Sequence, residues 1–577
     1  MKNNKFKIFL SVLVFGGVLF ASCADLAVQN TNEPTTEAVF SDPSNLTKLL
    51  RGGFYDWSTA VVTSYGTHPD LIADQITSTN NVRNFWDFAQ EPRLRLANTT
   101  SYGGAASWRV FYGGFNSAIT TANLFIANPD TPDDFLAQAY FLRGVARGYL
   151  GMFFDQGYLI DEDFDATTDT PEFVPYGQII DGAIADLDLA ISLAASTSAT
   201  FSFNAMPNPS ESWDSDEFQD VVNSFAARIL AGEARTAAEA ANTDWQAVLD
   251  YADAGIGGPD ALSSLGVFSN SNIGSSGEFA NYYQDWSNFI VSCGATVDSC
   301  SGYLPTDVKV THSMDPDYPT TYPTAQANGT TADLAPANSA DPRLDGYYVY
   351  TTNAGFLRST RNPNLYSNYF SGRLWSGNDW WQESNDVILF TDTETDLLRA
   401  EAQVMLDQDL AAANTLNAST AGTGTTTIGF TLYSESNGII ADATLSGGYN
   451  FVGTETLPQQ QFALMREYAV EVAGLGGAGT NWAFMRRHDL LQEGTMTMFP
   501  VPGTQLEILG IDIYTFGGVD NAGTAGTASG ANSWTGLAAR AGLTKARPAG
   551  DNTFTPNKAK IDASSINTLS AKGAKSN

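Results

Sequence analysis

Apolar side chains recur in several segments at alternating steps of three and four residues, which is the spacing of one face of an α-helix. The clearest stripe runs from Phe135 to Phe153, and Asp133 and Asp134 stand at its start, where acidic side chains cap a helix. Such stripes nearly always face a core. The sequence therefore predicts a mainly α-helical fold. Further helices are expected at about 44–59, 108–127, 180–194, 218–229, 244–254, 392–412 and 462–472.

Between these helices lie three long stretches rich in Gly, Ser, Thr, Asn, Pro and aromatic residues, at about 60–107, 256–385 and 413–457. Loops of this length in a compact protein usually carry function. No repeat is strict enough to predict a solenoid from the sequence alone. A binding or catalytic surface is therefore expected in these stretches and not on the helical stripes.

The charge balance excludes some partners. The chain has 63 acidic and 29 basic residues, which gives a formal net charge of −34, while 43% of its residues are hydrophobic. That hydrophobic content is typical of a globular protein. A surface this acidic repels phosphate backbones, so nucleic-acid binding is excluded, and a polybasic attachment to anionic lipid is equally disfavoured.

The N-terminus resembles a lipoprotein signal peptide. Lys2, Lys5 and Lys7 precede the uncharged apolar run Ile8–Phe20, and two small residues then lead to Cys23. The run is shorter than the roughly 20 apolar residues that a membrane-spanning helix needs. We expect Cys23 to be acylated and the mature protein to be anchored to a membrane without spanning it. The alternative is an ordinary cleaved signal peptide followed by an incidental cysteine.

Only two cysteines remain, Cys293 and Cys300. In an oxidising compartment their spacing suits a small loop closed by a disulfide, and two free thiols are the other possibility. A zinc site is disfavoured because only His312 lies nearby and there is no second cysteine pair.

An ordered set of motifs extends over most of the chain, and together they resemble the SusD/RagB family of nutrient-binding lipoproteins. The set follows the lipoprotein-like N-terminus and ends near residue 513. It comprises Leu49–Tyr55, Leu71–Asp74, Trp108 with Tyr112, Asn116 and Ala122-Asn123, Ala139–Gly144, Ile184–Leu187, Asp341–Leu344, Leu398–Ala402, Arg466-Glu467, Glu471, Trp482, Arg486–Leu490 and Phe499–Pro502.

The resemblance implies a scaffold of paired tetratricopeptide-like helices whose irregular loops form a ligand face. It also implies a lipid-anchored, cell-surface protein of the outer membrane that works with a SusC-like TonB-dependent transporter and is not an enzyme. We expect a signal peptide at 1–22, a flexible tether at 23–43, a SusD-like nutrient-binding domain at 44–516 and a low-complexity, mobile C-terminal tail at 517–577.

Catalytic and cofactor motifs are sparse. Gly474, Gly476 and Gly479 satisfy a GxGxxG pattern, but it follows a helical stripe where a dinucleotide site needs a strand. None of the three histidines lies in a recognisable nucleophile or zinc motif. A carboxylate pair for glycoside hydrolysis stays open as an alternative, because 63 acidic residues are available and nothing selects one pair.

One acidic loop has the spacing of a calcium-binding loop. Its carboxylates occupy positions 1, 3, 5, 9 and 12 of an EF-hand-like segment, which gathers oxygen ligands around Ca²⁺. The glycine of the sharp turn is replaced by Ala166, and Pro171 interrupts a second helix. A solvated acidic loop is therefore the main interpretation and calcium the alternative. The residues are Asp161, Asp163, Asp165, Asp169 and Glu172.

Aromatic residues in the loops give the best indication of a ligand. Flat aromatic faces pack against the apolar C–H faces of sugars, and Asn and Arg side chains bond the hydroxyls at the edges. Any one of these tryptophans is more often a core plug of its own loop, so we expect at least two of them to line a ligand face. The candidates are Arg83, Asn84 and Trp86 in the first stretch, and Tyr283, Trp286, Trp375, Trp380 and Trp381 in the second.

The sequence thus favours capture of an oligosaccharide and its delivery to the transporter, with no cofactor. Three alternatives remain: a peptide cargo within the same family, a surface glycoside hydrolase, and a purely structural scaffold. A hydrolase would depend on a carboxylate pair, and a scaffold would bind no soluble ligand.

Overall fold

The computed structural model describes most of the chain. The described residues are 40, 43–62, 64–165, 167–197, 213–265, 267–270, 303–320, 334–339, 341–352, 367–371, 387–418, 451–472 and 479–543. The chain divides into two compact units, 1–46 and 47–577, and all packing described below lies within the second. No helix among the described residues is long and apolar enough to cross a membrane.

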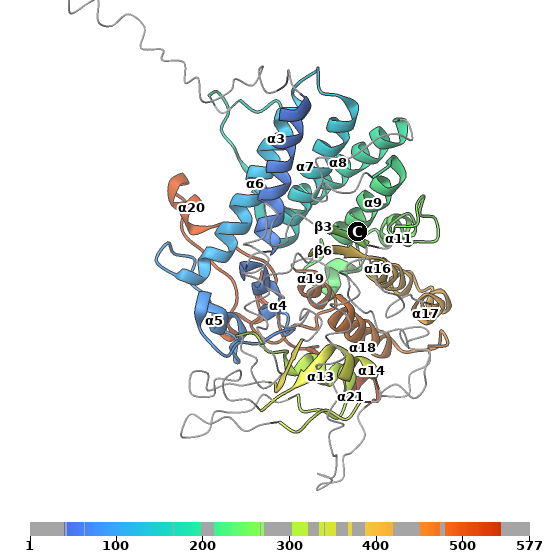
Figure 1. The fold of residues 1–577 in the computed structure, drawn as a ribbon. Coiled ribbons are helices and arrows are strands. Elements are labelled where there is room, and N and C mark those ends of the chain that lie inside the picture. Colours follow the sequence, from blue (N-terminus) through green and yellow to red (C-terminus); the bar gives the residue numbers. More distant parts are fainter. Residues whose placement is uncertain are drawn as a thin grey trace, which may run out of the picture. The chain divides into compact units, whose positions relative to one another are not determined.

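Consecutive helices pack side by side through the body of the protein, as Figure 1 shows. The prediction of a mainly helical fold built from helical pairs is confirmed. The predicted stripe from Phe135 to Phe153 lies in α7, where its members from Ala139 onward are at most 1% exposed. The long helices are α3 (Pro43–Val62), α6 (Ala106–Ile126), α7 (Asp133–Phe153), α8 (Tyr176–Ser196), α9 (Ser215–Ala231), α11 (Trp245–Asp253), α16 (Asp392–Met405), α17 (Asp409–Ala418), α18 (Leu457–Glu467) and α19 (Thr480–Arg487).

Short helices and two-stranded antiparallel sheets form the connections. The sheets pair β1 (Gln156–Tyr158) with β2 (Phe173–Pro175), β3 (Val267–Asn270) with β6 (Val387–Thr391), and β4 (Tyr348–Tyr350) with β5 (Tyr369–Ser371). The short helices that matter below are α4 (His68–Ile72), α5 (Phe85–Ala89), α13 (Val308–Met314), α14 (Pro342–Tyr347), α20 (Gly503–Leu509) and α21 (Leu537–Arg540).

Two glycines let α7 approach its neighbours closely. A Cβ atom on Gly144 would lie 2.7 Å from Leu187 of α8, and one on Gly148 would overlap Ile229 of α9. Any larger side chain at either position would therefore push a helix away from the centre of the core.

Two buried arginines satisfy helix ends. The Arg235 guanidinium donates to the carbonyl oxygens of Gly151, Met152 and Phe154 at the end of α7. Arg486 donates in the same way to Gly232, just after α9, at 2.6 Å. The last carbonyl groups of a helix have no partner within it and carry its negative dipole end, so a cation there is favourable. Burial nevertheless lowers the pKa of Arg235 to about 10.

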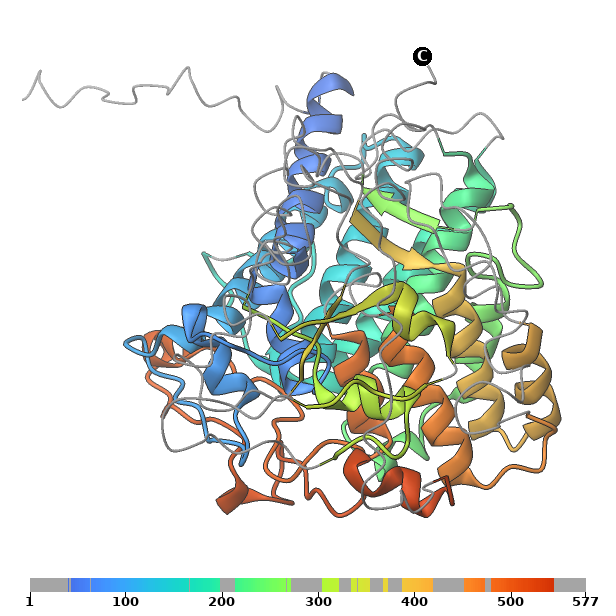
Figure 2. The same ribbon diagram turned by 60° about the horizontal axis from the view of Figure 1, so that its bottom comes forward.

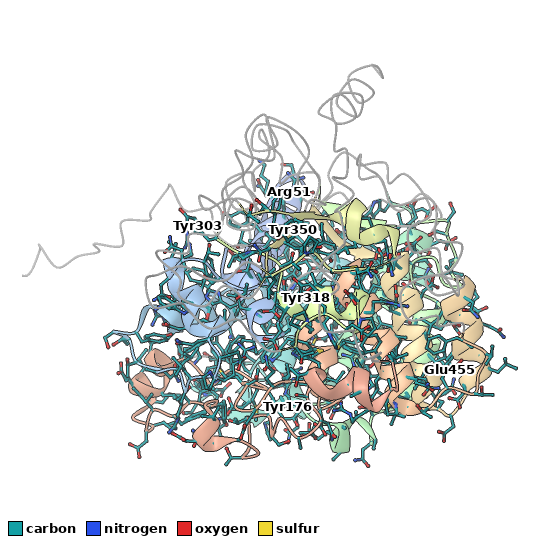
Figure 3. All side chains as sticks on the ribbon, turned by 90° about the horizontal axis from the view of Figure 1, so that it is seen from below. Arg51, Tyr176, Tyr303, Tyr318, Tyr350 and Glu455 are labelled. Carbon is teal, nitrogen blue, oxygen red and sulfur yellow. The ribbon has the colours of Figure 1, made fainter. Side chains whose placement is uncertain are left out.

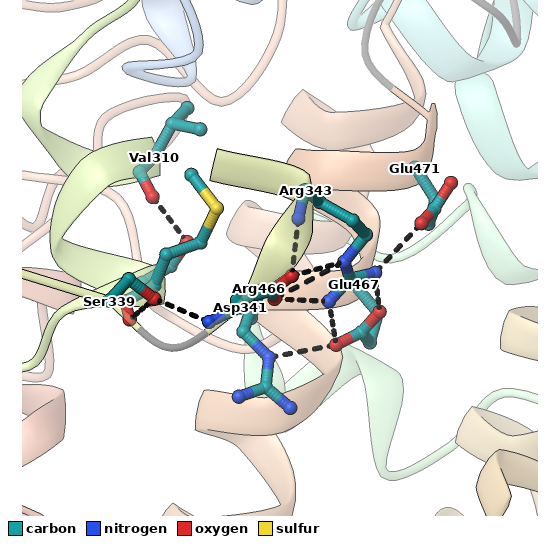
Figure 4. Close-up of polar contacts among 9 residues, drawn as sticks. Val310, Ser339, Asp341, Arg343, Arg466, Glu467 and Glu471 are labelled. Carbon is teal, nitrogen blue, oxygen red and sulfur yellow. Dashed lines mark hydrogen bonds and ion pairs between the residues drawn. The ribbon is translucent and has the colours of Figure 1, made fainter. Parts of the chain in front are cut away.

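Buried ion pairs join segments that are distant in the sequence. Arg228 of α9 bonds Glu394 of α16 at 2.6 Å, and Arg487 of α19 bonds Glu401 of α16 at 2.5 Å. In a third cluster one arginine serves three carboxylates: Arg343 of α14 contacts Asp341, Glu467 and Glu471 at 2.6–2.7 Å (Figure 4). The motifs that carry the family resemblance therefore place most of their charged residues in the core.

The described part of the segment predicted as a C-terminal tail is folded. Residues 517–543 pack against the body, and α21 contacts α18 (Figure 2). Trp534 is fully buried and its indole N–H donates to Asp74 at 2.8 Å, while Leu537 is also fully buried. Because most residues of this segment are small, its sequence does not indicate that Trp534 and Leu537 belong to the core. Residues 544–577 lie outside the described part of the chain.

We expect a chain that ends at residue 543 to keep the thermal stability of the full chain, and a chain that ends at 516 to lose it. The shorter chain lacks Trp534, and removal of one buried tryptophan side chain alone costs about 3–5 kcal/mol. Thermal unfolding followed by circular dichroism measures both chains. Equal melting temperatures for the two would show that residues 517–543 contribute nothing to the core.

The Glu401 pair makes stability depend on pH. Burial alone would raise the pKa of Glu401, but Arg487 and His488 hold it down to about 2, below the ordinary 4.5. A depressed pKa in the folded state contributes stability that is complete above pH 4.5 and is lost as the pH falls towards 2. We expect Glu401→Gln to cost about 3–5 kcal/mol at neutral pH, because it leaves Arg487 buried without its partner.

Urea unfolding across this pH range tests the pair. The difference in unfolding free energy between wild type and Glu401→Gln should shrink below pH 4.5. The exposed Glu507 provides the matched control, since Glu507→Gln should differ little from wild type at any pH. A difference that stays constant down to pH 2 would contradict this account.

Candidate ligand-binding surface

Two consecutive residues of the predicted site adopt a left-handed backbone conformation. Arg83 has φ 52° and Asn84 has φ 61°, within the short turn Val82–Asn84 that leads into α5. For residues with a Cβ atom this conformation costs about 1–2 kcal/mol each. The turn is thus a strained feature that its surroundings must hold in place, and such features gather at functional sites.

A stack of aromatic rings lies beneath this turn. The Arg83 guanidinium lies 5.1 Å from the centre of the Tyr65 ring, and Tyr65 stacks on His68 at 5.6 Å. The fully buried His68 places Nε2 3.1 Å from the Arg83 carbonyl oxygen and Nδ1 2.9 Å from that of Tyr65. Burial lowers the pKa of His68 to about 4, so its ring is neutral at neutral pH.

A second set of contacts fixes the Asn84 side chain. Its amide donates to one carboxylate oxygen of Asp87 at 2.9 Å, and the Tyr102 hydroxyl donates to the same oxygen at 2.7 Å. Burial, together with the negative charge of Asp87, raises the pKa of Tyr102. The phenol therefore remains a hydrogen-bond donor at every physiological pH.

Trp86 differs from every other tryptophan that the structure describes. It is partly exposed, whereas the remaining described tryptophans are at most 4% exposed. Its neighbours Phe85 and Phe88 point into the core. The indole N–H of Trp86 is buried and has no hydrogen-bond partner among the described residues. An aromatic face, an amide and a guanidinium thus stand within four residues at the surface.

A buried arginine clamps the two short helices that flank this segment. Arg93 donates to the carbonyl oxygens of Ile72 at the end of α4 and Phe88 of α5. It also contacts Asp74 and, at 2.6 Å, Glu91. Burial raises the pKa of Glu91 to about 8 although Arg93 opposes the shift. Acids with raised pKa also occur in active sites, but here Glu91 pairs with an arginine that joins two helices.

The other predicted aromatic residues, Tyr283, Trp286, Trp375, Trp380 and Trp381, lie outside the described residues. The described residues that flank their segments are neighbours. Asn270 of β3 precedes the segment of Tyr283 and Trp286, and it pairs with Val387 of β6, which follows the segment of the three other tryptophans. Thr306 follows the first of these segments and Tyr369 precedes the second, and the Thr306 amide donates to the Tyr369 carbonyl oxygen at 2.8 Å.

Residues 303–306 also pair with the segment that precedes the Arg83 turn. The amide groups of Thr77 and Thr79 donate to the carbonyl oxygens of Pro305 and Tyr303, both at 2.8 Å. In Figure 3, Tyr303 and Tyr350 lie toward the same side of the view. The sequence analysis missed Tyr65, His68, Tyr102 and Tyr303. No local signal marks them, because their roles depend on pairing between distant segments.

Several carboxylates of the acidic loop that the structure describes bond groups of their own loop or an arginine. Asp165 accepts hydrogen bonds from the Thr167 amide and hydroxyl, and Asp169 accepts one from the Asp165 amide. Among the described residues, no three His, Cys, Asp or Glu side chains are grouped so that they could hold a metal ion. Glu162, in the same loop, pairs with Arg143 at 2.5 Å. Cys23, Cys293 and Cys300 lie outside the described part of the chain.

Two of the three histidines are buried without a catalytic partner in the described structure. Burial lowers the pKa of His312 to about 4, as it does for His68. The third, His488, places Nε2 2.8 Å from Glu401, which is already bound by Arg487. All three take part in core packing.

Comparison with known proteins identifies the fold. No protein-family model and no curated protein sequence matches the chain. A SusD homolog from Parabacteroides distasonis ATCC 8503 matches with a TM-score of 0.53 and 13% identity, over 85% of this chain and 97% of that one. The chain therefore has a SusD-like fold.

Two further solved structures are less similar. A SusD-like carbohydrate binding protein from Bacteroides fragilis NCTC 9343 has a TM-score of 0.49 and 12% identity, over 78% of this chain and 86% of that one. A SusD/RagB family protein from Bacteroides thetaiotaomicron VPI-5482 has a TM-score of 0.44 and 13% identity, over 81% and 88%.

Calcium remains an untested alternative for the acidic loop. Because Asp165 and Asp169 already bond the backbone of their own loop, we expect millimolar calcium to leave the melting temperature unchanged, relative to the same concentration of magnesium. A rise specific to calcium, abolished in Asp165→Asn, would instead establish a binding site.

Proposed function

We propose that this protein binds an oligosaccharide at the surface formed by Arg83, Asn84 and Trp86, and that it does not transform its ligand. The observation that carries the proposal is the partial exposure of Trp86 when all the other described tryptophans are buried. A partly exposed aromatic ring beside a strained turn is typical of a ligand-binding surface. A sugar is a suitable ligand because its C–H face packs on such a ring.

The geometry suits a sugar in two further respects. The Arg83 guanidinium and the Asn84 amide stand two or three residues from Trp86, so they can donate to hydroxyl groups at the edge of a stacked sugar ring. The turn is held by Tyr65 and His68 before any ligand arrives, which reduces the entropy lost on binding. We include Tyr283, Trp286, Trp375, Trp380 and Trp381 in this surface, since neighbouring strands flank their segments.

We also propose a place in the cell. The SusD-like fold and the lipoprotein-like N-terminus ending at Cys23 support a protein anchored by lipid to the outer membrane and exposed at the cell surface. There it would pass its cargo to a SusC-like TonB-dependent transporter. Release into a transporter requires modest affinity, which a surface with a few aromatic contacts provides.

Peptide cargo is the second candidate within the same fold. The Asn84 amide is a donor that a peptide carbonyl group can use as well as a sugar hydroxyl. The hydrolase is not favoured by Glu91, the carboxyl with a raised pKa nearest to Trp86 in the sequence, because Glu91 pairs with Arg93.

Affinity electrophoresis of the soluble form starting at Ala24 tests the proposal. The gels would contain amylopectin, xyloglucan, laminarin or polygalacturonate. We expect one glycan to retard the wild type, and Trp86→Ala to weaken that binding about tenfold or more, as expected for loss of a central aromatic anchor. The control is Leu410→Ala, a residue that is 63% exposed. It belongs to α17, a helix that lies across the view from α5 in Figure 1.

The outcomes separate the alternatives. Retardation that Trp86→Ala leaves intact would place sugar binding elsewhere on the protein. No retardation by any glycan, together with binding of a peptide library, would shift the assignment to peptide cargo. Release of reducing sugar during the assay would show that the protein is a hydrolase after all.

A further inference from the structure

His68 lies directly under the proposed ligand-binding segment and is completely buried. Its ring centre lies 4.2 Å from that of Phe88 in α5 and 5.6 Å from that of Tyr65. The ring therefore occupies the space between α4, α5 and the residues that precede α4. A phenylalanine would fill this space equally well if packing were the only function of the side chain.

Both ring nitrogens of His68 face carbonyl oxygens, which can only accept hydrogen bonds. Nε2 lies 3.1 Å from the Arg83 oxygen and Nδ1 2.9 Å from the Tyr65 oxygen. A neutral imidazole carries one N–H and can therefore donate to one of the two. The tautomer with the proton on Nε2 holds the Arg83 carbonyl group.

The Arg83 carbonyl group is the point at which the turn can be fixed. It belongs to the peptide that joins the two left-handed residues, and the orientation of this peptide sets ψ of Arg83 (26°) and φ of Asn84 (61°). A flip of the peptide would return Asn84 to a negative φ, which residues with a Cβ atom prefer. The flip by itself moves the flanking chain little, but relaxation of φ at both Arg83 and Asn84 to negative values would change the direction in which α5 and Trp86 leave the turn.

We propose that His68 is a positioning residue: by donating from Nε2 to the Arg83 carbonyl oxygen it fixes the left-handed turn that presents Arg83, Asn84 and Trp86 to a ligand. The consequence for the ligand rests on the proposed function, whereas the effect on the turn does not. A second anchor exists, since Asn84 is bound to Asp87, so the turn loosens without His68 and the rest of the fold persists.

Fluorine NMR of the ligand-free protein tests this directly. The tryptophans are replaced by 5-fluorotryptophan, and the Trp86 resonance is assigned from its absence in Trp86→Phe. In His68→Phe, which keeps a ring and removes the donor, we expect the Trp86 resonance to shift or broaden while those of the buried tryptophans stay in place. His68→Gln restores a donor and should return the signal toward its wild-type position.

His312→Phe is the matched control. His312 is also buried and also has one nitrogen, Nδ1, 3.0 Å from a carbonyl oxygen, that of Tyr318. Its ring lies 5.7 Å from Trp534, so this variant should move the Trp534 resonance and leave that of Trp86 unchanged. A general loss of stability would affect both variants alike, whereas positioning makes their effects specific.

Each result decides the proposal. An unmoved Trp86 resonance in His68→Phe overturns it, and so does unfolding of both His68→Phe and His68→Gln, because His68 would then serve the whole core. If the shift occurs, the glycan panel used above should show binding at least about tenfold weaker in His68→Phe than in His312→Phe. If no glycan binds the wild type, the proposed function fails while the NMR result still stands.

Discussion

Charge pairing in the core is the constraint on which the rest of this structure depends. The chain has few cations, yet nine arginines among the described residues are buried: Arg93, Arg143, Arg147, Arg228, Arg235, Arg343, Arg466, Arg486 and Arg487. Each guanidinium has several donors in a fixed plane, so one side chain can satisfy two or three carboxylates or the open end of a helix. Loss of one such arginine would leave several buried acceptors without a partner at once.

This use of arginine has a consequence for the surface. Among the described residues the buried cations are matched by buried carboxylates, so the exterior carries nearly the whole net charge of −34. Anionic ligands are repelled over long distances by such a surface. A neutral cargo such as a sugar has no such barrier, and Arg83 is among the described arginines that are not buried.

Contacts connect this core to the proposed site step by step. Trp534 and Gln492 of the C-terminal segment donate to Asp74, and Asp74 pairs with Arg93. Arg93 in turn holds the ends of α4 and α5, and α4 carries His68. The surface turn is therefore supported through a contact between two residues that lie 460 positions apart in the sequence.

The separation in sequence between contacting residues also decides which features could be predicted from the sequence. Helical stripes such as the one in α7 are local patterns, and the structure confirms them. Trp86 could be proposed as a site residue because its type and its loop are local features as well. The packing of Trp534 could not be predicted, since its partner Asp74 belongs to the first stretch of the chain and a Gly-rich, Ala-rich context suggests mobility. The family motifs were recognisable, but their charged members proved to be core residues, a distinction that depends on burial alone.

The turn at Arg83 shows why a binding surface is harder to predict than a core. Asn84 tolerates a left-handed backbone and hints at a turn, but Arg83 gives no such signal. Its conformation depends on two contacts with buried or neighbouring rings: the Arg83 carbonyl oxygen lies near His68 Nε2, and the Arg83 guanidinium packs over the Tyr65 ring. Strain of this kind costs the free protein stability and is maintained by the surrounding fold. In return the side chains are already in place when a ligand arrives, so that little binding energy is lost in ordering them. The rigid helical core and the strained surface turn are therefore parts of one arrangement, in which long-range pairing keeps a short segment in a conformation that it would not adopt alone.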